Sequence, residues 1–205
     1  MRKDRKQQSL ASFEKQAVTY DVANDGRHAR ALYPEVLQKL DNFVFDSVLD
    51  IGCGTGVLLA SITTWCCKAQ SGLDLSQAMI EQAKKKLGTN ADLRVGDVER
   101  LPWQNESFDL VLCTDSFHHY PKPDIALTEM HRVLKKGGRL MIADYYAPAP
   151  IRQILNLFIA FSKDGDVRIY SRSEILDLLG RAGFDSVEWT RLANRSYLVE
   201  AANNL

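Results

Sequence analysis

The sequence predicts an α/β fold with a mostly parallel sheet of seven strands, helices on both faces and one antiparallel closing strand. Apolar, strand-like runs alternate with segments of helical spacing over most of the chain, which is typical of a doubly wound parallel sheet. The first of these runs passes through a glycine-rich turn into a helix, and the last two are close enough to form a hairpin. With 205 residues the chain is long enough for one domain with a sizeable core, so we expect a single domain over 1–205.

The segments before the first strand are expected to be helical. Ser9–Tyr20 and Asp25–Leu40 have helical spacing and no strand beside them, and we interpret 1–40 as a helical lid. The core that follows, 41–143, contains five expected parallel strands: Ser47–Ile51, Gly72–Leu75, Asp92–Val95, Phe108–Cys113 and Arg139–Ala143. A helix is expected at Asp124–Leu134, closed by Gly137 and Gly138, which also open the fifth strand.

The pattern changes at residue 144, where 144–170 is expected to form an insert over one edge of the sheet. Pro148 and Pro150 exclude regular helix and central strand, and an apolar segment follows at Ile151–Phe161. Six apolar residues recur there at helical spacing: Ile151, Ile154, Leu155, Leu157, Phe158 and Phe161. This face has two interpretations, packing on the sheet edge or the wall of a substrate pocket.

The last segment, 171–205, is expected to contain a helix and a closing strand pair. Ser171 and Glu174 have capping-box spacing, which begins a short helix that ends near Gly183. Ser186–Thr190 and Ser196–Ala201 then predict two antiparallel strands.

Charge and hydropathy exclude several classes of partner. Lys and Arg together number 26, as do Asp and Glu, so no net charge attracts nucleic acid or an anionic membrane. The basic run at 2–6 is expected to be a frayed, solvated terminus. No run is apolar and long enough for a membrane span or a signal peptide, so we expect a soluble, cytoplasmic protein.

The cysteines predict neither a disulfide nor a metal centre. There are four, at Cys53, Cys66, Cys67 and Cys113, without a Cys-x-x-Cys motif, and an adjacent pair is poor geometry for either bond type. From ligand spacing along the chain we therefore expect no metal site.

The turn after the first strand predicts a ligand site. Asp50 is followed by Gly52, Gly54 and Gly56, which have no Cβ and tolerate positive φ, so the backbone can lie against a ligand. The spacing is Gly-x-Gly-x-Gly, and Val57 stands where the third glycine of a dinucleotide fingerprint would fall. A pyrophosphate cradle is therefore disfavoured, and with it a nicotinamide-dependent oxidoreductase.

Polar residues stand at four successive strand ends, where open α/β sheets bind ligands. They are Asp50, Asp74, Asp97 and the Cys113–Ser116 segment. Asp74 is suitably spaced from the glycine turn to accept both hydroxyls of a ribose, and Asp97 could accept from an adenine amine, with Leu75 and Val98 on the ring faces. Each also has a local interpretation: Asp74 as a helix N-cap, Asp97 as a turn residue, and Asp50 as a buried acid bonded to its own turn. Together they predict a nucleoside pocket.

Two further polar side chains have a structural interpretation only. Asp109 starts a strand and is expected to be structural, and His131 is expected on the surface of its helix.

The chain resembles the class I S-adenosylmethionine-dependent methyltransferases, particularly the small-molecule group that includes ubiquinone and menaquinone biosynthesis enzymes. The resemblance covers about 13–143 and consists of several motifs: Phe13…Ala17-x-x-Tyr20-Asp21, Val48-Leu-Asp-x-Gly-Cys-Gly-Thr-Gly, Gly72-x-Asp74-x-Ser76-x-x-Met79, Gly96-Asp97-x-x-x-Leu101-Pro102, Phe108-Asp109-x-Val111, His118-His119 and Glu129-x-x-Arg132 through Gly138. It implies a Rossmann-like fold, with S-adenosylmethionine as the methyl donor and S-adenosylhomocysteine as its product.

The resemblance also implies roles for individual residues. Asp50 and the turn Gly52, Cys53, Gly54 and Gly56 would hold the methionine part, with Tyr20 closing over it; Asp74 would hold the ribose; Asp97 and Val98, with Leu75, would hold the adenine; the backbone at Cys113 would take the amino group; and Met79 belongs to the same set. After the fourth strand the chain has Cys-Thr-Asp-Ser, without the Asn/Asp-Pro-Pro-Tyr motif of nucleic-acid and protein amino methylases, so we do not expect amide or base-amine methylation. Long substrate-specific insertions are also missing.

Methyl transfer itself asks mainly for alignment and exclusion of water, because a sulfonium methyl is already electrophilic. An acidic hydroxyl or carbon acceptor also needs a base, for which His118 and His119 are the first candidates and Tyr145 the second. Packing against Phe117 and Tyr120 is the alternative for the two histidines. We expect O- or C-methylation of a small, partly apolar molecule; the alternative is a protein that binds S-adenosylmethionine without catalysis.

Overall fold

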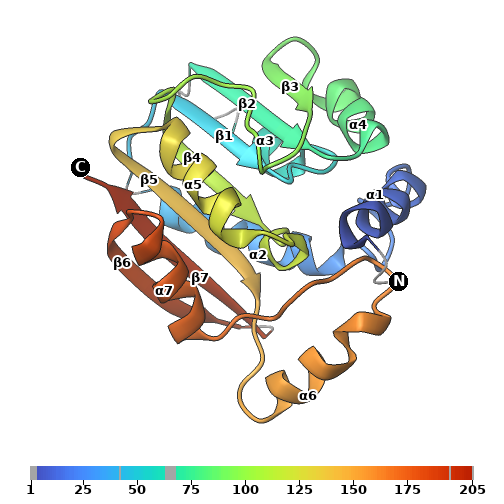
Figure 1. Ribbon diagram of the computed structural model, residues 1–205. Helices are drawn as coiled ribbons and strands as arrows, with labels where there is room; N and C mark the ends of the chain where they lie inside the picture. The colour runs from blue at the N-terminus through green and yellow to red at the C-terminus, as the bar shows by residue number, and fades with distance from the viewer. Residues whose placement is uncertain (1–3, 42, 63–67, 194, 205) are drawn as a thin grey trace.

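Seven strands form one sheet in the computed structural model, which describes residues 4–41, 43–62, 68–193 and 195–204 (Figure 1). The strand order is β3-β2-β1-β4-β5-β7-β6. The strands are β1 (Ser47–Ile51), β2 (Ala69–Asp74), β3 (Ala91–Val95), β4 (Phe108–Thr114), β5 (Leu134–Tyr145), β6 (Asp185–Leu192) and β7 (Ser196–Asn203). β7 pairs antiparallel with β5 and β6, and the other pairs are parallel. The predicted fold class is confirmed.

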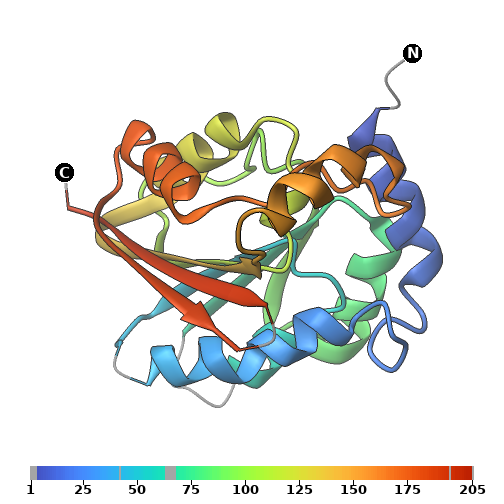
Figure 2. The same ribbon diagram turned by 90° about the horizontal axis from the view of Figure 1, so that it is seen from below.

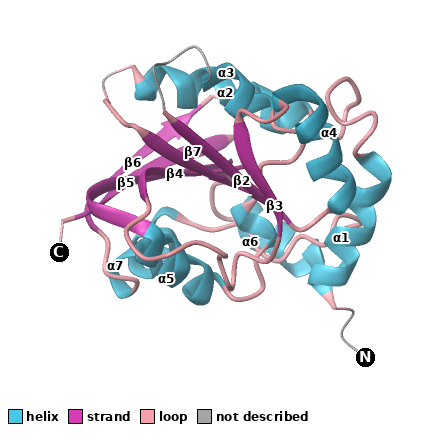
Figure 3. Ribbon diagram, turned by 90° about the horizontal axis from the view of Figure 1, so that it is seen from above, coloured by secondary structure: helices cyan, strands magenta, loops and turns pink. Residues whose placement is uncertain are grey.

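Helices cover both faces of the sheet (Figure 3). One face carries α2 (Arg27–Leu40), α3 (Val57–Ile62) and α4 (Gln77–Leu87), and the other carries α5 (Pro123–Val133) and α7 (Arg172–Arg181). Two helices lie beyond the strand ends, α1 (Arg5–Gln16) and α6 (Ile151–Phe158), and two short 3-10 turns follow β4 and α6, η1 (Phe117–His119) and η2 (Ile159–Phe161).

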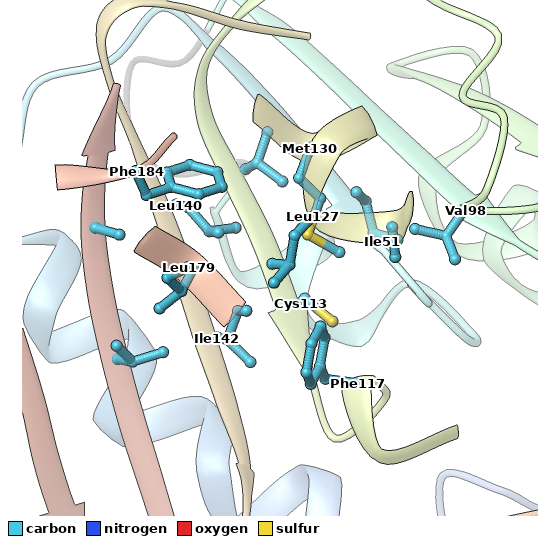
Figure 4. Packing of buried hydrophobic residues seen from close by; sticks show 14 of the residues in the cluster. Ile51, Val98, Cys113, Phe117, Leu127, Met130, Leu140, Ile142, Leu179 and Phe184 are labelled. Atoms are coloured by element: carbon cyan, nitrogen blue, oxygen red, sulfur yellow. The ribbon is translucent and has the colours of Figure 1, made fainter. Parts of the chain in front are cut away.

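The core is divided by the sheet into two apolar layers. Along β4, Leu110 and Leu112 face the α2–α4 layer, whereas Val111 and Cys113 face the α5–α7 layer. This alternation follows from the two-residue period of a strand. Figure 4 shows the second layer, in which Leu127, Met130 and Leu179 from the helices pack against strand residues such as Ile51 and Ile142.

The predicted boundaries of helices and strands agree best with the structure where the sequence carries a local signal. Ser171 begins α7 with the predicted capping box: its Oγ accepts from the Glu174 N–H at 3.2 Å, and the Glu174 carboxylate accepts from the Ser171 N–H at 2.7 Å. The predicted role of Gly137 and Gly138 is wrong, because α5 ends at Val133 and β5 already begins at Leu134. The glycines lie inside the strand.

The N-terminal helix α1 lies across the carboxyl ends of β1–β3, and three acid or base side chains anchor this segment (Figure 1). The second helix of the expected lid, α2, packs instead on the face of the sheet, where Leu32 and Val36 are buried in the core. Lys6 Nζ donates to Asp97 and Glu99, both at 2.6 Å, and Glu14 accepts from Ser76 Oγ at 2.8 Å. After α1, Asp21 accepts from Thr55 Oγ1 at 2.5 Å. The expectation of a frayed basic terminus is therefore wrong for Arg5 and Lys6, which belong to a docked helix; residues 1–3 lie outside the described part.

α6 stands away from the sheet beyond the end of β5 (Figure 1). None of its residues is buried, and Phe158 is 63% and Phe161 80% exposed. Packing of this apolar face on the sheet edge, one of its two interpretations, is therefore wrong.

Asp109 is structural, as predicted. Its carboxylate accepts from the Ser47 N–H at 2.9 Å and from Lys135 Nζ at 2.9 Å, which joins the starts of β1, β4 and β5. His131, by contrast, is not a simple surface residue, because its ring packs edge-on against Phe184 at 5.0 Å.

Two sequence predictions concern the cysteines and membrane spans. Cys66 and Cys67 lie outside the described residues. Within the described part of the chain, every helix is too short or too polar to cross a membrane.

Candidate active site

The glycine turn between β1 and α3 opens into a cavity at the carboxyl ends of the strands. Gly52 and Gly54 both have positive φ, +73° and +51°. A Cβ on Gly52 would lie 2.1 Å from Ser116 Oγ, whereas a Cβ on Gly54 would meet nothing within 4 Å. Gly56 allows α4 to pack closely against the turn, since a Cβ there would lie 3.0 Å from Ala83 Cβ. Of the three glycines in this turn, Gly54 is therefore the one that presents bare backbone to free space.

Asp74, at the end of β2, is tied to this turn. Its carboxylate accepts from the Gly54 N–H at 2.9 Å and from the Ser76 N–H at 2.9 Å. The N-cap of α4 is Ser76, whose Oγ accepts from the Met79 N–H at 3.1 Å, so Asp74 is not the cap. Burial raises the pKa of Asp74 to about 6, although the backbone hydrogen bonds from Ser76 and Gly54 lower it.

Asp97, after β3, combines a turn contact with a lid contact. It accepts from the Glu99 N–H at 3.0 Å and pairs with Lys6 at 2.6 Å. Asp97 Oδ2 is the oxygen that accepts from Lys6, so a ligand that hydrogen-bonds to this oxygen has to displace Lys6 or share the oxygen with it.

The first cavity is lined by most of the residues predicted to bind a cofactor: Tyr20, Gly52, Cys53, Gly54, Asp74, Leu75, Met79, Asp97 and Val98. Asp50, Gly56 and Cys113 do not line it. Asp50 is buried behind the turn, where burial, with Asp74 nearby, raises its pKa to about 7. Lys6, Tyr33 and Tyr120 also line the cavity, and sequence reasoning missed them because they come from helices or turns without a motif.

A second cavity of about 600 Å³ adjoins the first on the side of α6. One wall is apolar and includes Leu155, Phe158 and Phe161; the other carries His28, His118 and Tyr145 among its polar groups. Four residues line both cavities: Phe13, Tyr20, Asp115 and His119. These four define the junction, where a group bound in one cavity can meet a group bound in the other.

His118 and His119 form the turn η1 after β4, beside the junction. His118 Nδ1 lies 2.6 Å from Asp144 Oδ1, and its Nε2 lies 3.5 Å from Asp166 Oδ1. Burial lowers the pKa of His118, but Asp144, with Asp115 and Asp166, outweighs burial and raises it to about 10. Burial, together with the charge of His118, holds the pKa of His119 well below its ordinary value.

The structure adds His28, a residue that sequence reasoning missed. His28 Nδ1 lies 2.5 Å from Asp115 Oδ1, and its Nε2 lies 3.0 Å from Ser196 Oγ. The Tyr145 ring packs against it at 5.5 Å. Burial lowers the pKa of His28, but the hydrogen bond with Asp115 outweighs burial and raises it. Asp115 has a positive φ of +53°, uncommon for a residue other than glycine. No spacing rule joins a histidine in α2 to the end of β4, and this backbone outlier is visible only in the structure.

Several known proteins to which this chain is similar are methyltransferases. A family model described as a methyltransferase domain matches residues 49–142, which carry the glycine turn, Asp74, Asp97 and both histidines of η1. Malonyl-[acyl-carrier protein] O-methyltransferase of Geobacter sulfurreducens is 29% identical over 192 residues, covering 86% of this chain and 70% of that protein. Demethylmenaquinone methyltransferase of Streptomyces avermitilis is 27% identical over 219 residues, covering 92% and 91%.

Solved structures share the fold. A chain in the complex between the Haloferax volcanii Trm112 methyltransferase activator and its methyltransferase superposes with a TM-score of 0.83, covering 96% of this chain and 98% of that one, at 19% identity. The sheet order, the cofactor-type turn and the relatives agree: the chain belongs to the class I S-adenosylmethionine-dependent methyltransferases.

Proposed function

We propose that this methyltransferase acts on an oxygen or carbon atom of a small, partly apolar molecule that binds in the second cavity. The observation that carries the proposal is the junction formed by Phe13, Tyr20, Asp115 and His119, which belongs to both cavities. Methyl transfer requires the acceptor atom and the methyl carbon to meet in line at one point. A junction between two otherwise separate cavities supplies such a point.

The first cavity fits the cofactor on an observation of the chain itself. Gly54 offers bare backbone to the cavity, and Asp74, held by two backbone N–H groups, carries an acid beside it. When bound, S-adenosylmethionine supplies an electrophilic methyl group. We propose that Gly52, Cys53 and Gly54 contact the methionine part, Asp74 the ribose, and Asp97 with Leu75, Met79 and Val98 the adenine, while Tyr20 closes over the methionine end. Asp50 and Gly56 would act by shaping the turn, and Cys113 through its backbone.

The second cavity fits an acceptor with an apolar body and one polar end. Leu155, Phe158 and Phe161 offer apolar surface, while His28, Tyr145 and the η1 histidines offer polar groups on the opposite wall. The two relatives named above act, by their names, on a malonyl group carried on a protein and on demethylmenaquinone. We propose that His118 or His119, with Tyr145 in second place, contacts the reacting end of the acceptor, because His119 lies at the junction itself.

The test is a titration followed by a transfer assay. S-adenosylhomocysteine should bind with micromolar affinity in calorimetry, and NADH should leave the melting temperature unchanged. The chain should then transfer a labelled methyl group to phenolic, quinol or carboxylic acceptors that carry an apolar tail. Binding of S-adenosylhomocysteine without transfer to any member of a broad panel would favour a non-catalytic binding protein.

We extend two sequence predictions to this proposal. With equal numbers of acidic and basic residues, the protein should not bind DNA or RNA at physiological salt. The sequence also predicts that activity needs no divalent metal, because the sulfonium is itself the electrophile; a metal that orients the acceptor would be an addition to that chemistry.

A further inference from the structure

Three side chains beside the junction converge on one point. Asp166 Oδ1 lies 3.5 Å from His118 Nε2 and 3.3 Å from His119 Nδ1. All three ligand atoms lie within 4.8 Å of one another. Atoms that bind one zinc ion tetrahedrally at about 2.0–2.2 Å are about 3.3–3.6 Å apart, so the two measured separations match the edges of such a site.

His119 Nδ1 is the ligand atom that is left without a hydrogen-bond partner among the described residues. This nitrogen is buried, and its 3.3 Å approach to Asp166 Oδ1 does not meet hydrogen-bond geometry. A buried polar atom without a partner destabilises the folded state. A cation between His119 and Asp166 would satisfy it.

In His118 and Asp166, the polar atom that does not face the cluster is hydrogen-bonded to another residue. His118 Nδ1 is bonded to Asp144 Oδ1 at 2.6 Å, which leaves Nε2 directed at Asp166. Asp166 Oδ2 accepts from Ser162 Oγ at 2.5 Å, which leaves Oδ1 directed at the histidines. Metal-binding histidines characteristically hydrogen-bond to a carboxylate through their second nitrogen. Asp144 therefore supports His118 from behind and is not itself a ligand.

The backbone holds the two halves of the cluster together. The N–H groups of Val167 and Arg168 donate to the His118 carbonyl at 2.9 and 3.2 Å. The chain after α6, residues 162–168, also contacts α1, because Gln8 Nε2 donates to the Ser162 carbonyl at 2.5 Å. Figure 2 shows α1 and this segment side by side. The cluster exists because the chain after α6 returns to η1.

We propose that His118, His119 and Asp166 bind one divalent transition metal ion of the zinc class, with an open coordination position toward the second cavity. Two imidazoles and one carboxylate favour zinc or iron(II) over magnesium or calcium, which prefer all-oxygen ligands. All three residues line the second cavity, so the open position faces the space assigned to the acceptor. The metal would hold an acceptor oxygen at the junction and favour its deprotonated form. This role rests on the proposed function, whereas the site itself does not.

The test measures metal binding by tag-free full-length protein, with Zn²⁺ alone as the probe. Competition with a chromophoric chelator should give one Zn²⁺ per chain. Co²⁺ bound in its place should give the visible absorption bands of a four- or five-coordinate site. Asp166→Asn and His119→Gln should each weaken Zn²⁺ binding at least about tenfold. Asp164→Asn is the matched control: this acid lines the same cavity in the same segment, but its carboxylate accepts from Ser12 and Gln16 and is not part of the cluster.

The outcomes separate this inference from the proposed function. Failure of the wild-type protein to bind Zn²⁺ stoichiometrically, or equal binding by Asp166→Asn, His119→Gln and Asp164→Asn, would overturn the metal site. Titration of S-adenosylhomocysteine into the wild-type protein checks the proposed function independently, and the melting temperature and circular dichroism spectrum verify that each variant is folded. If S-adenosylhomocysteine binds and Zn²⁺ does not, the metal site is refuted and the methyltransferase proposal stands; the reverse result keeps the site and removes its assigned role.

Discussion

Gly54 provides a sharp test of where the cofactor lies. Its φ of +51° disfavours any residue with a Cβ, and alanine in that conformation is destabilising by roughly 1–2 kcal/mol. In the ligand-free protein the added methyl group would meet nothing within 4 Å, so no clash adds to this penalty. With a ligand against the turn, the methyl group would overpack the contact by about 1–3 kcal/mol. Gly54→Ala should therefore weaken S-adenosylhomocysteine binding roughly 5- to 150-fold.

Gly137→Ala is the matched control for this experiment. Gly137 also has positive φ, +76°, and a Cβ there would also meet nothing within 4 Å, but it lies in β5 outside the first cavity. Both variants should lower the melting temperature by a similar amount, roughly 2–8 °C for a chain of this size. Only Gly54→Ala should change the dissociation constant measured by calorimetry.

Two results would refute the reasoning. If Gly54→Ala binds S-adenosylhomocysteine as tightly as the wild type, no ligand lies against the turn at this residue. If both variants lose affinity equally, the loss comes from backbone strain spread through the sheet and not from a contact. Gly54→Val enlarges the effect, because its side chain occupies more of the cavity, and should abolish measurable binding.

Three further perturbations test other parts of the site. Asp74→Ala should weaken S-adenosylhomocysteine binding roughly ten- to a hundredfold, because a charged hydrogen-bond acceptor is lost beside the ligand; unchanged affinity in calorimetry would remove the ribose assignment. Phe158→Ala should alter acceptor KM or turnover and leave S-adenosylhomocysteine affinity nearly unchanged, since Phe158 lines only the second cavity and is 63% exposed; a large drop in melting temperature with normal kinetics would instead make it a packing residue. Burial raises the pKa of Asp50 to about 7, so the folded state holds a proton that the unfolded state releases near pH 4, and the free energy of unfolding should fall as the pH rises from about 4 to 7. Asp50→Asn has no charge to lose and should give a flatter profile in urea denaturation; identical profiles would contradict the assignment.

The sequence by itself determined the sheet and the edge of it at which the first cavity lies. Alternating apolar runs and helical segments specify parallel strands, and the carboxyl ends of parallel strands share one edge. Gly54, Asp74 and Asp97 come together for this reason alone, since each lies at or shortly after the carboxyl end of a strand. Local rules were also enough for the capping box of α7, because its two partners are separated by a single helical turn.

Only the tertiary structure decided which residues cover the first cavity and which polar side chains line the second. Lys6 reaches Asp97 because α1 docks across the strand ends, and His28 reaches Asp115 because α2 packs against the sheet. Asp166 meets His118 and His119 because the chain after α6 returns to η1. The partners in each pair are far apart along the chain, and no period or spacing relates them. Their meeting depends on the combined packing of helices and loops that have no regular hydrogen-bond register with the sheet, and only the folded chain specifies that packing.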